Sequence, residues 1–319
     1  MYLEIALLLS GLFILILGGD FLVRGASSIA LGLRISPMVV GLTIVAFGTS
    51  TPELLISIKA ALSGSPDLTM GNVVGSNICN LALVLGVTAL ISPIYVASDS
   101  VKIDWPVTMA SSILLFLIAR EGFINMYEGV IFIFLLILYL IFLIVKSRKE
   151  NQRMEELESL ASESPGHKTD FKALSKDIGF MILGCIGLYF GAEWFVGGAK
   201  TIALNLGVSE RVIGITVLAL GTSLPELTTA IIASLKKQTD LALGNLLGSN
   251  IFNILSILGI TSIITEIQVN DLIVNEDMIW MMGITLLILP FMVTGRHLQR
   301  WEGAVLVVIY LYYTINVII

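Results

Sequence analysis

Glu53 and Glu226 are the residues whose chemistry stands out in this chain, because each carboxylate lies within an otherwise apolar segment. Placing a charged side chain at the centre of a bilayer costs about 2.5–3.5 kcal/mol or more. A glutamate in such a position therefore requires a cation, a proton or a water-filled cavity beside it. We interpret both residues as ligands of a cation.

The residues around each glutamate would supply further oxygen atoms. Each glutamate follows a proline, which has no N–H to donate to the carbonyl four residues earlier and crowds that carbonyl. Carbonyls near Gly48 and Gly221 should therefore lack helical partners, and a hard cation prefers such oxygens beside a carboxylate. The same turns carry hydroxyl groups on Thr49, Ser50, Thr222 and Ser223. The alternative is a kinked helix with structural hydrogen bonds, which a second, matching copy makes less attractive.

A second motif, G-N-x-x-G-S-N-x-x-N, follows each glutamate segment. Its glycines recur every four positions and predict a small-residue face for close helix packing. Four positions also separate Ser76 from Asn80 and Ser249 from Asn253, so each pair shares a helix face. These side chains either direct neutral oxygens at the glutamates or form bonds between helices. The other asparagines fall on different faces, and we expect structural bonds from them: Asn72, Asn77, Asn245 and Asn250.

The two motifs occur twice because the chain contains an internal repeat. A shift of 173 positions places residues 18–86 on residues 191–259 without a gap, and about half of the positions are identical. GTSTPE (48–53) then meets GTSLPE (221–226), and Asp20 meets Glu193. For Asp20 and Glu193 we expect positions at helix ends, solvated near the membrane surface.

Composition indicates that lipid surrounds most of the chain. Hydrophobic residues make up 56% of it and charged residues only 13%, about half the usual share of charge. Ten apolar segments are long enough to suggest membrane helices. They are residues 3–23, 37–62, 68–91, 105–119, 124–145, 177–198, 210–235, 241–264, 277–293 and 301–318. The segments 37–62 and 210–235 contain glycine and proline, so we expect broken helices there.

Five apolar segments fit within one repeat, and an odd number reverses the direction in which the second copy enters the membrane. The sequence therefore predicts an all-α polytopic membrane protein of ten helices in two inverted-topology repeats, with its site at the repeat interface. The predicted units are a first repeat at 1–145, with its motif at 41–86, and a second at 177–319, with its motif at 214–259. A polar linker at 146–176 joins them.

The distribution of charge predicts an orientation and excludes one class of partner. Basic residues gather in the linker and in the loops on its side, so that side should be cytoplasmic and both termini outside. The sequence has no stripe of basic residues that could bind nucleic acid, and its net charge is −6. The N-terminal apolar run lacks a basic region before it and is interpreted as the first spanning helix. Cys79 and Cys185 are interpreted as packing residues, although a disulfide stays open.

The doubled GTSxPE and GNxxGSNxxN motifs resemble the paired repeats of the cation/Ca²⁺ exchanger superfamily, in its prokaryotic sodium/calcium exchanger branch. The resemblance covers most of the chain. It implies alternating-access exchange of Na⁺ for Ca²⁺ across the cell membrane, with no cofactor and with the ions and the bilayer as partners. It also implies a ligand set. Ca²⁺ would be held by Glu53, Glu226, Asn80, Asn253 and the carbonyls of Thr49 and Thr222, and Na⁺ by Ala46, Thr49, Ser50, Ser76, Ala219, Thr222, Ser223 and Ser249.

Two departures from that family leave the choice of ions open. Thr51 stands where leucine is commoner, and Asn253 stands where some relatives, including potassium-dependent ones, have aspartate. An exchanger that uses H⁺, or carries another divalent ion, is therefore the alternative function. A passive channel fits inverted repeats with buried carboxylates less well. An enzyme is not expected, because the only histidines, His167 and His297, lie in loops away from any intramembrane serine. The sequence leaves the oligomeric state unpredicted.

Overall fold

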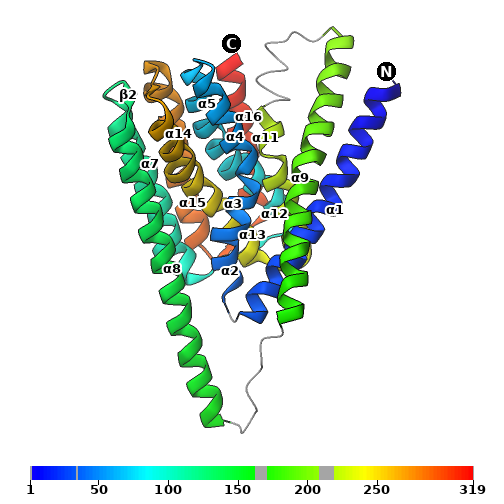
Figure 1. Cartoon of the computed structure of the whole chain (residues 1–319), viewed down its shortest axis with the longest axis vertical. Helices are drawn as coiled ribbons and strands as arrows, with labels where there is room; N and C mark the ends of the chain where they lie inside the picture. The colour runs from blue at the N-terminus through cyan, green and yellow to red at the C-terminus, as the bar shows by residue number, and fades with distance from the viewer. Residues whose placement is uncertain (1, 34, 162–170, 208–218, 319) are drawn as a thin grey trace.

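The computed structural model describes the backbone of residues 2–33, 35–161, 171–207 and 219–318, and the side chains of these residues except 151–161, 171–173, 219 and 318. The described chain is almost entirely helical (Figure 1). Seven of its helices are long and apolar enough to cross a membrane, or eight if one bent pair counts as a span. The coarse prediction of a polytopic helical membrane protein is therefore confirmed.

Apolar side chains and early prolines account for the helices. Several carry a π-helical turn, labelled η, within a continuous helical run. The first half contains α1 (Tyr2–Gly32), α2 (Pro37–Val40), η1 (Gly41–Val45), α3 (Ala46–Thr49), α4 (Thr51–Leu62), α5 (Pro66–Ile78), η2 (Cys79–Val84), α6 (Leu85–Ile91), η3 (Ser100–Asp104), α7 (Trp105–Ala119) and α8 (Met126–Ala161). The second contains α9 (Phe171–Asn205), α11 (Ala219–Thr222), α12 (Leu224–Leu235), α13 (Thr239–Phe252), η5 (Asn253–Leu258), α14 (Gly259–Ile264), η6 (Ile273–Asp277), α15 (Met278–Val293) and α16 (Arg300–Ile318).

Helical residues occur within every one of the ten predicted segments, although part of segment 210–235 lies outside the described residues. The linker differs from a simple loop. Helix α8 continues well past residue 145, and α9 begins at Phe171. Lysine and glutamate are good helix formers, and Lys146 pairs with Glu150 one turn later. Figure 1 shows α8 projecting beyond the other helices at the end opposite both chain termini.

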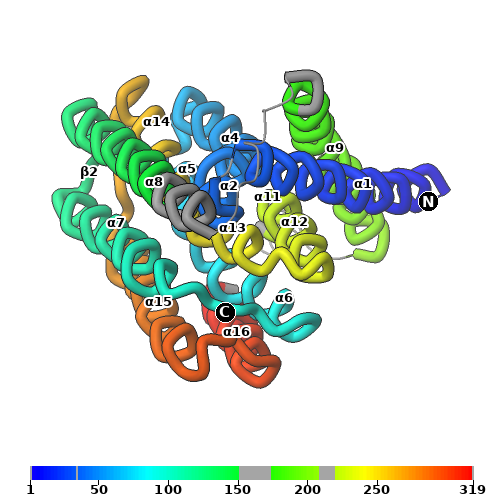
Figure 2. Tube along the Cα trace, turned by 90° about the horizontal axis from the view of Figure 1, so that it is seen from below, coloured from blue at the N-terminus to red at the C-terminus, as the bar shows by residue number. Residues whose placement is uncertain are grey.

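Helices α1 and α9 pack along one another through small residues (Figure 2). A Cβ atom on Gly11 would lie 2.4 Å from the backbone nitrogen of Phe195, and one on Gly184 would lie 2.6 Å from that of Leu22. Only glycine allows the two backbones to approach this closely. Gly11 and Gly184 are also 173 positions apart, so the repeat offset continues before residue 18.

Other contacts recur at nearly the same offset. The strands β1 (Ile94–Tyr95) and β4 (His297–Leu298) form one antiparallel pair, and β2 (Phe123–Ile124) and β3 (Ile267–Gln268) form another. The start of β3 lies 173 positions after the start of β1, and the start of β4 lies 174 after that of β2. Tyrosine–aspartate bonds behave alike, with Tyr139 donating to Asp104 and Tyr313 to Asp277. Matched segments of the two halves therefore make matched contacts.

Candidate ion-binding site

The two GTSxPE segments form breaks between helices. Ser50 separates α3 from α4, and Ser223 separates α11 from α12. The helical run Pro37–Thr49 and α4 meet at an angle of 44°, so the predicted break in the first segment is confirmed. Pro52 and Pro225 lie in the first turns of α4 and α12, where a missing N–H is tolerated and a fixed φ favours a new helix.

Each glutamate occupies the first turn of the helix after its break. The unpaired N–H groups at a helix N-terminus favour a negative charge there. Both side chains have 0% exposure. Neither oxygen of Glu53, nor Oε2 of Glu226, has a hydrogen-bond partner among the described residues. Leaving buried polar atoms unpaired is costly, and three such carboxylate oxygens in one place provide negative charge for a cation.

Contacts between the two halves surround Glu226. The Ser50 hydroxyl donates to Oε1 of Glu226 at 3.3 Å, and Ser249, on α13, lies 3.5 Å from the same oxygen. The Thr49 hydroxyl lies 3.1 Å from Oδ1 of Asn245 and 3.4 Å from the Ser249 hydroxyl. Residues nearly 200 positions apart are thus brought together, as the repeat predicted.

Asn80 and Asn253, which match one another across the repeat, lie in π-helical turns. Asn80 is the second residue of η2, and Asn253 is the first residue of η5. Such turns are frequent at functional sites because the extra residue redirects the side chains around it. Both asparagines have 0% exposure, and neither Oδ1 atom has a hydrogen-bond partner among the described residues. Both asparagines thus have a buried carbonyl oxygen that is left without a partner, as the carboxylate oxygens are.

The remaining predicted site residues divide into three groups. Ala46 and Ser76 are buried, and the buried Ser223 hydroxyl lacks a partner in the described part of the chain. Thr222 is half-buried at the end of α11. The backbone of Ala219 begins α11, while its side chain lies outside the described atoms.

The structure corrects the expectation for Asp20 and Glu193. Both lie well inside α1 and α9, not at helix ends, because these helices are longer than the apolar segments suggested. Asp20 forms ion pairs with Arg24, one turn later, and with Lys236 after α12. Cys79 and Cys185 are free cysteines, so no disulfide joins them. Cys79 lies in the apolar core and Cys185 packs against it, in agreement with their interpretation as packing residues.

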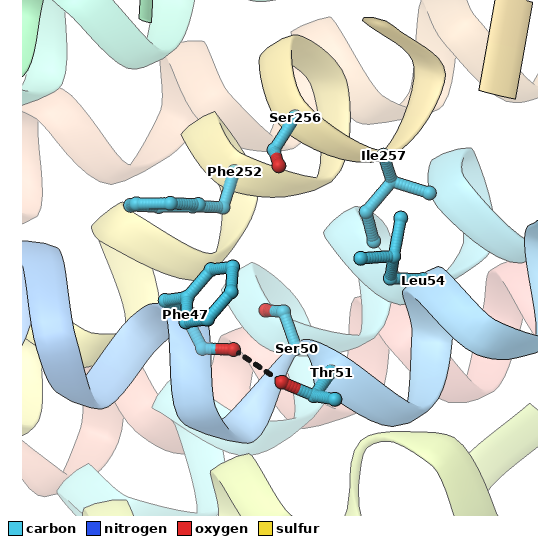
Figure 3. A pocket seen from close by; sticks show the side chains of 7 residues that line it. All are labelled: Phe47, Ser50, Thr51, Leu54, Phe252, Ser256 and Ile257. Carbon is cyan, nitrogen blue, oxygen red and sulfur yellow. Dashed lines mark hydrogen bonds between the residues drawn. The ribbon is translucent and has the colours of Figure 1, made fainter. Parts of the chain in front are cut away.

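A small pocket lies beside the first break (Figure 3). Figure 3 shows the Ser50 hydroxyl at this pocket and the Thr51 hydroxyl donating to the Phe47 carbonyl at 2.8 Å. The rings of Phe47 and Phe252, 5.9 Å apart, line one side of it. The lining of this pocket is thus mostly apolar, with hydroxyl groups from Ser50, Thr51 and Ser256.

The chemistry of these groups suits a cation that binds and leaves. No group of three or more His, Cys, Asp or Glu side chains gathers anywhere in the described residues. The site instead combines two carboxylates with hydroxyl and amide oxygens, which are the ligands of hard cations such as Ca²⁺. Both glutamates are fully buried in this conformation.

Comparison with known proteins assigns a family to this arrangement. The model of the sodium/calcium exchanger protein family matches residues 3–145 and 176–319. The chain belongs to the sodium/calcium exchanger family. This is a family of membrane transporters and not a family of enzymes. The matched ranges leave out residues 146–175.

Individual known proteins match nearly the whole chain. The putative antiporter CaxA of Alkalimonas amylolytica is 39% identical over 96% of this chain and 95% of its own length. The sodium/calcium exchanger MaX1 of Methanosarcina acetivorans is 35% identical over 95% of each chain. Among solved structures, the sodium-calcium exchanger NCX_Mj, soaked with 10 mM Na⁺ and no Ca²⁺, superimposes with a TM-score of 0.83. That match has 32% identity and covers 98% of this chain and 97% of the other.

Proposed function

We propose that this exchanger is a secondary active antiporter that couples Na⁺ movement in one direction to Ca²⁺ movement in the other. The observation that carries the proposal is the pair Glu53 and Glu226, fully buried, with three carboxylate oxygens that have no hydrogen-bond partner among the described residues. Two carboxylates balance the charge of one Ca²⁺. Buried ions need such compensation because transfer from water to a low-dielectric interior is very unfavourable.

The proposed Ca²⁺ ligands are the two glutamates and the oxygens that surround them. Asn80 and Asn253 contribute their side-chain carbonyls, which also lack partners in the described part of the molecule. Thr49 and Thr222 contribute backbone carbonyls beside the helix breaks. The proposed Na⁺ ligands lie around this centre: Ala46, Thr49, Ser50, Ser76, Ala219, Thr222, Ser223 and Ser249. Na⁺ and Ca²⁺ would share the glutamates, so their binding would compete and the exchange would be coupled.

The proposed architecture is ten membrane helices in two inverted repeats, 1–145 and 177–319. The sequence repeat of 173 positions and the matched strand pairs support it. A site between inverted repeats favours alternating access, in which one repeat moves against the other around the ions. The breaks at Ser50 and Ser223 would allow the two halves of each broken helix to move separately.

We place the exchanger in the cell membrane with both termini outside and the 146–176 linker in the cytoplasm. The basic loops on the linker side support this orientation. In Figure 1 both termini lie at one end of the molecule and the far end of α8 at the other.

The test compares the purified protein with Glu53→Ala and Glu226→Ala in proteoliposomes. Vesicles loaded with Na⁺ and diluted into Na⁺-free buffer should accumulate radiolabelled Ca²⁺ when they contain the unmodified protein. Each variant should lose at least about 90% of this uptake, since removing a ligand that balances a buried charge costs well over the roughly 1.4 kcal/mol of a tenfold change. Uptake near the unmodified level in either variant would remove that glutamate from the site.

A further inference from the structure

Four asparagines link the two halves of the exchanger in a closed set of hydrogen bonds. The side-chain amide of Asn77 donates to the backbone carbonyl of Asn250 at 3.3 Å, and that of Asn250 donates to the backbone carbonyl of Asn77, also at 3.3 Å. Asn80 donates to Oδ1 of Asn250 at 3.2 Å, and Asn253 donates to Oδ1 of Asn77 at 3.0 Å. All four side chains are at most 1% exposed.

These bonds fix which way each amide points. A backbone carbonyl only accepts hydrogen bonds, so Asn77 and Asn250 must direct their NH₂ groups at the opposite backbone. Their Oδ1 atoms then point the other way and accept from the NH₂ groups of Asn253 and Asn80. The orientation of Asn80 and Asn253 is therefore fixed as well, with each carbonyl oxygen turned away from the network.

The carbonyl oxygens left over are the two that the site needs. Oδ1 of Asn80 and Oδ1 of Asn253 are buried and have no hydrogen-bond partner among the described residues. An amide rotated by half a turn would present NH₂ hydrogens to the same place, and these repel a cation. A neutral amide is thus a good ligand only if something else holds its orientation, as second-layer hydrogen bonds do for metal ligands elsewhere.

We propose that Asn77 and Asn250 are positioning residues, each of which holds the carbonyl of a Ca²⁺ ligand from the opposite half toward the ion. This inference rests on the proposed function. The pairing is crossed: Asn250 acts on Asn80, and Asn77 acts on Asn253. Sequence position alone would pair each positioning residue with the ligand three residues after it in the same helical run.

The crossed pairing is tested by measuring the KM for Ca²⁺ and the maximal rate of Na⁺-driven uptake in single and double variants. Asn250→Ala should raise the KM about 5-fold to 20-fold, and Asn80→Ala should raise it at least as much. The double variant Asn250→Ala/Asn80→Ala should match Asn80→Ala alone, because an absent ligand needs no orientation. The matched control is Asn250→Ala/Asn253→Ala, in which the KM should rise above that of Asn253→Ala alone, because the remaining ligand Asn80 then loses its orientation.

The mirror-image set, Asn77→Ala with Asn253→Ala and with Asn80→Ala as its control, repeats the measurement on the other arm. Size-exclusion chromatography and thermal melting of each purified variant establish that it folds. An unchanged KM in Asn250→Ala and Asn77→Ala, or effects that multiply with the crossed partner, would overturn the proposal. Failure of both variants to fold would assign these residues a structural role and would also overturn it. Absence of Na⁺-driven uptake in the unmodified protein would instead contradict the proposed function itself.

Discussion

The Ser50 hydroxyl donates a hydrogen bond of 3.3 Å to Oε1 of Glu226, although the two residues are 176 positions apart in the chain. The equivalent residues of the other half do not form this bond, since neither the Ser223 hydroxyl nor either oxygen of Glu53 has a partner in the described part of the chain. Two nearly identical sequence motifs therefore have different hydrogen bonds in this conformation. We therefore expect Glu53 to depend more than Glu226 on a bound cation to compensate its charge.

This difference predicts unequal effects on stability when the glutamates are neutralised. In Ca²⁺-free buffer, Glu53→Gln should raise the melting temperature of the purified protein by several degrees, because an uncompensated buried charge is removed. Glu226→Gln should raise it less, because that carboxylate already accepts hydrogen bonds from Ser50 and Ser249. Both variants should lose the stabilisation of about 2.7 kcal/mol that a ligand gives at 100 times its Kd. Equal shifts in the two variants would contradict the asymmetry.

Close packing of α9 against both broken helices predicts a rescue experiment. A Cβ on Gly48 would lie 2.6 Å from Sγ of Cys185, and a Cβ on Gly221 would lie 2.4 Å from Cγ2 of Val196. Gly48→Ala should slow exchange and destabilise the protein by about 1–3 kcal/mol, as overpacking does. Cys185→Ala, which removes the clashing sulfur, should restore most of both losses. The matched control Gly48→Ala/Val196→Ala should restore neither, and rescue by that control would contradict the contact.

Protons should compete with Ca²⁺ for the two glutamates. A carboxylate must be ionised to bind a metal ion, so metal affinity falls as protons occupy the same oxygens. The two glutamates interact, so the titration belongs to the pair. The KM for Ca²⁺ should therefore rise as the pH falls from about 8 to about 5, and saturating Ca²⁺ should restore most of the rate. A KM that stays constant over this range would contradict direct binding by the glutamates.

The proposed orientation predicts which engineered cysteines react from outside the cell. Arg148 and Glu121 are both exposed; Arg148 lies within α8, and Glu121 lies in the turn between α7 and β2, before α8 begins. In a background without Cys79 and Cys185, Glu121→Cys should be labelled by a membrane-impermeant thiol reagent in intact cells. Arg148→Cys should be labelled only after the membrane is opened. The reverse pattern would invert the topology.

The breaks, the buried glutamates and the meeting of the two halves follow from the sequence, because proline, glycine and an acidic residue within an apolar repeat allow few alternatives. Other features depend on packing that no local pattern contains. The π-helical turns at Asn80 and Asn253 add one residue to a helix whose composition is unremarkable. The helix face of Asn77 and Asn250 predicts structural bonds for them, but it does not predict that these bonds cross to Asn253 and Asn80 in the opposite half. Helix α8 continues past residue 145 because the lysine and glutamate residues there favour a helix, although their polarity suggests a loop.

The most direct test of the central claim measures uphill Ca²⁺ accumulation in proteoliposomes under one imposed gradient at a time. An outward Na⁺ gradient should drive Ca²⁺ accumulation, and replacing all K⁺ with a large organic cation should leave the rate unchanged, because Asn253 offers a neutral oxygen where a carboxylate would hold a further monovalent charge. An outward H⁺ gradient without Na⁺ should drive none. Ca²⁺ accumulation driven by H⁺ alone would contradict Na⁺ coupling and establish an H⁺ exchanger on the same fold.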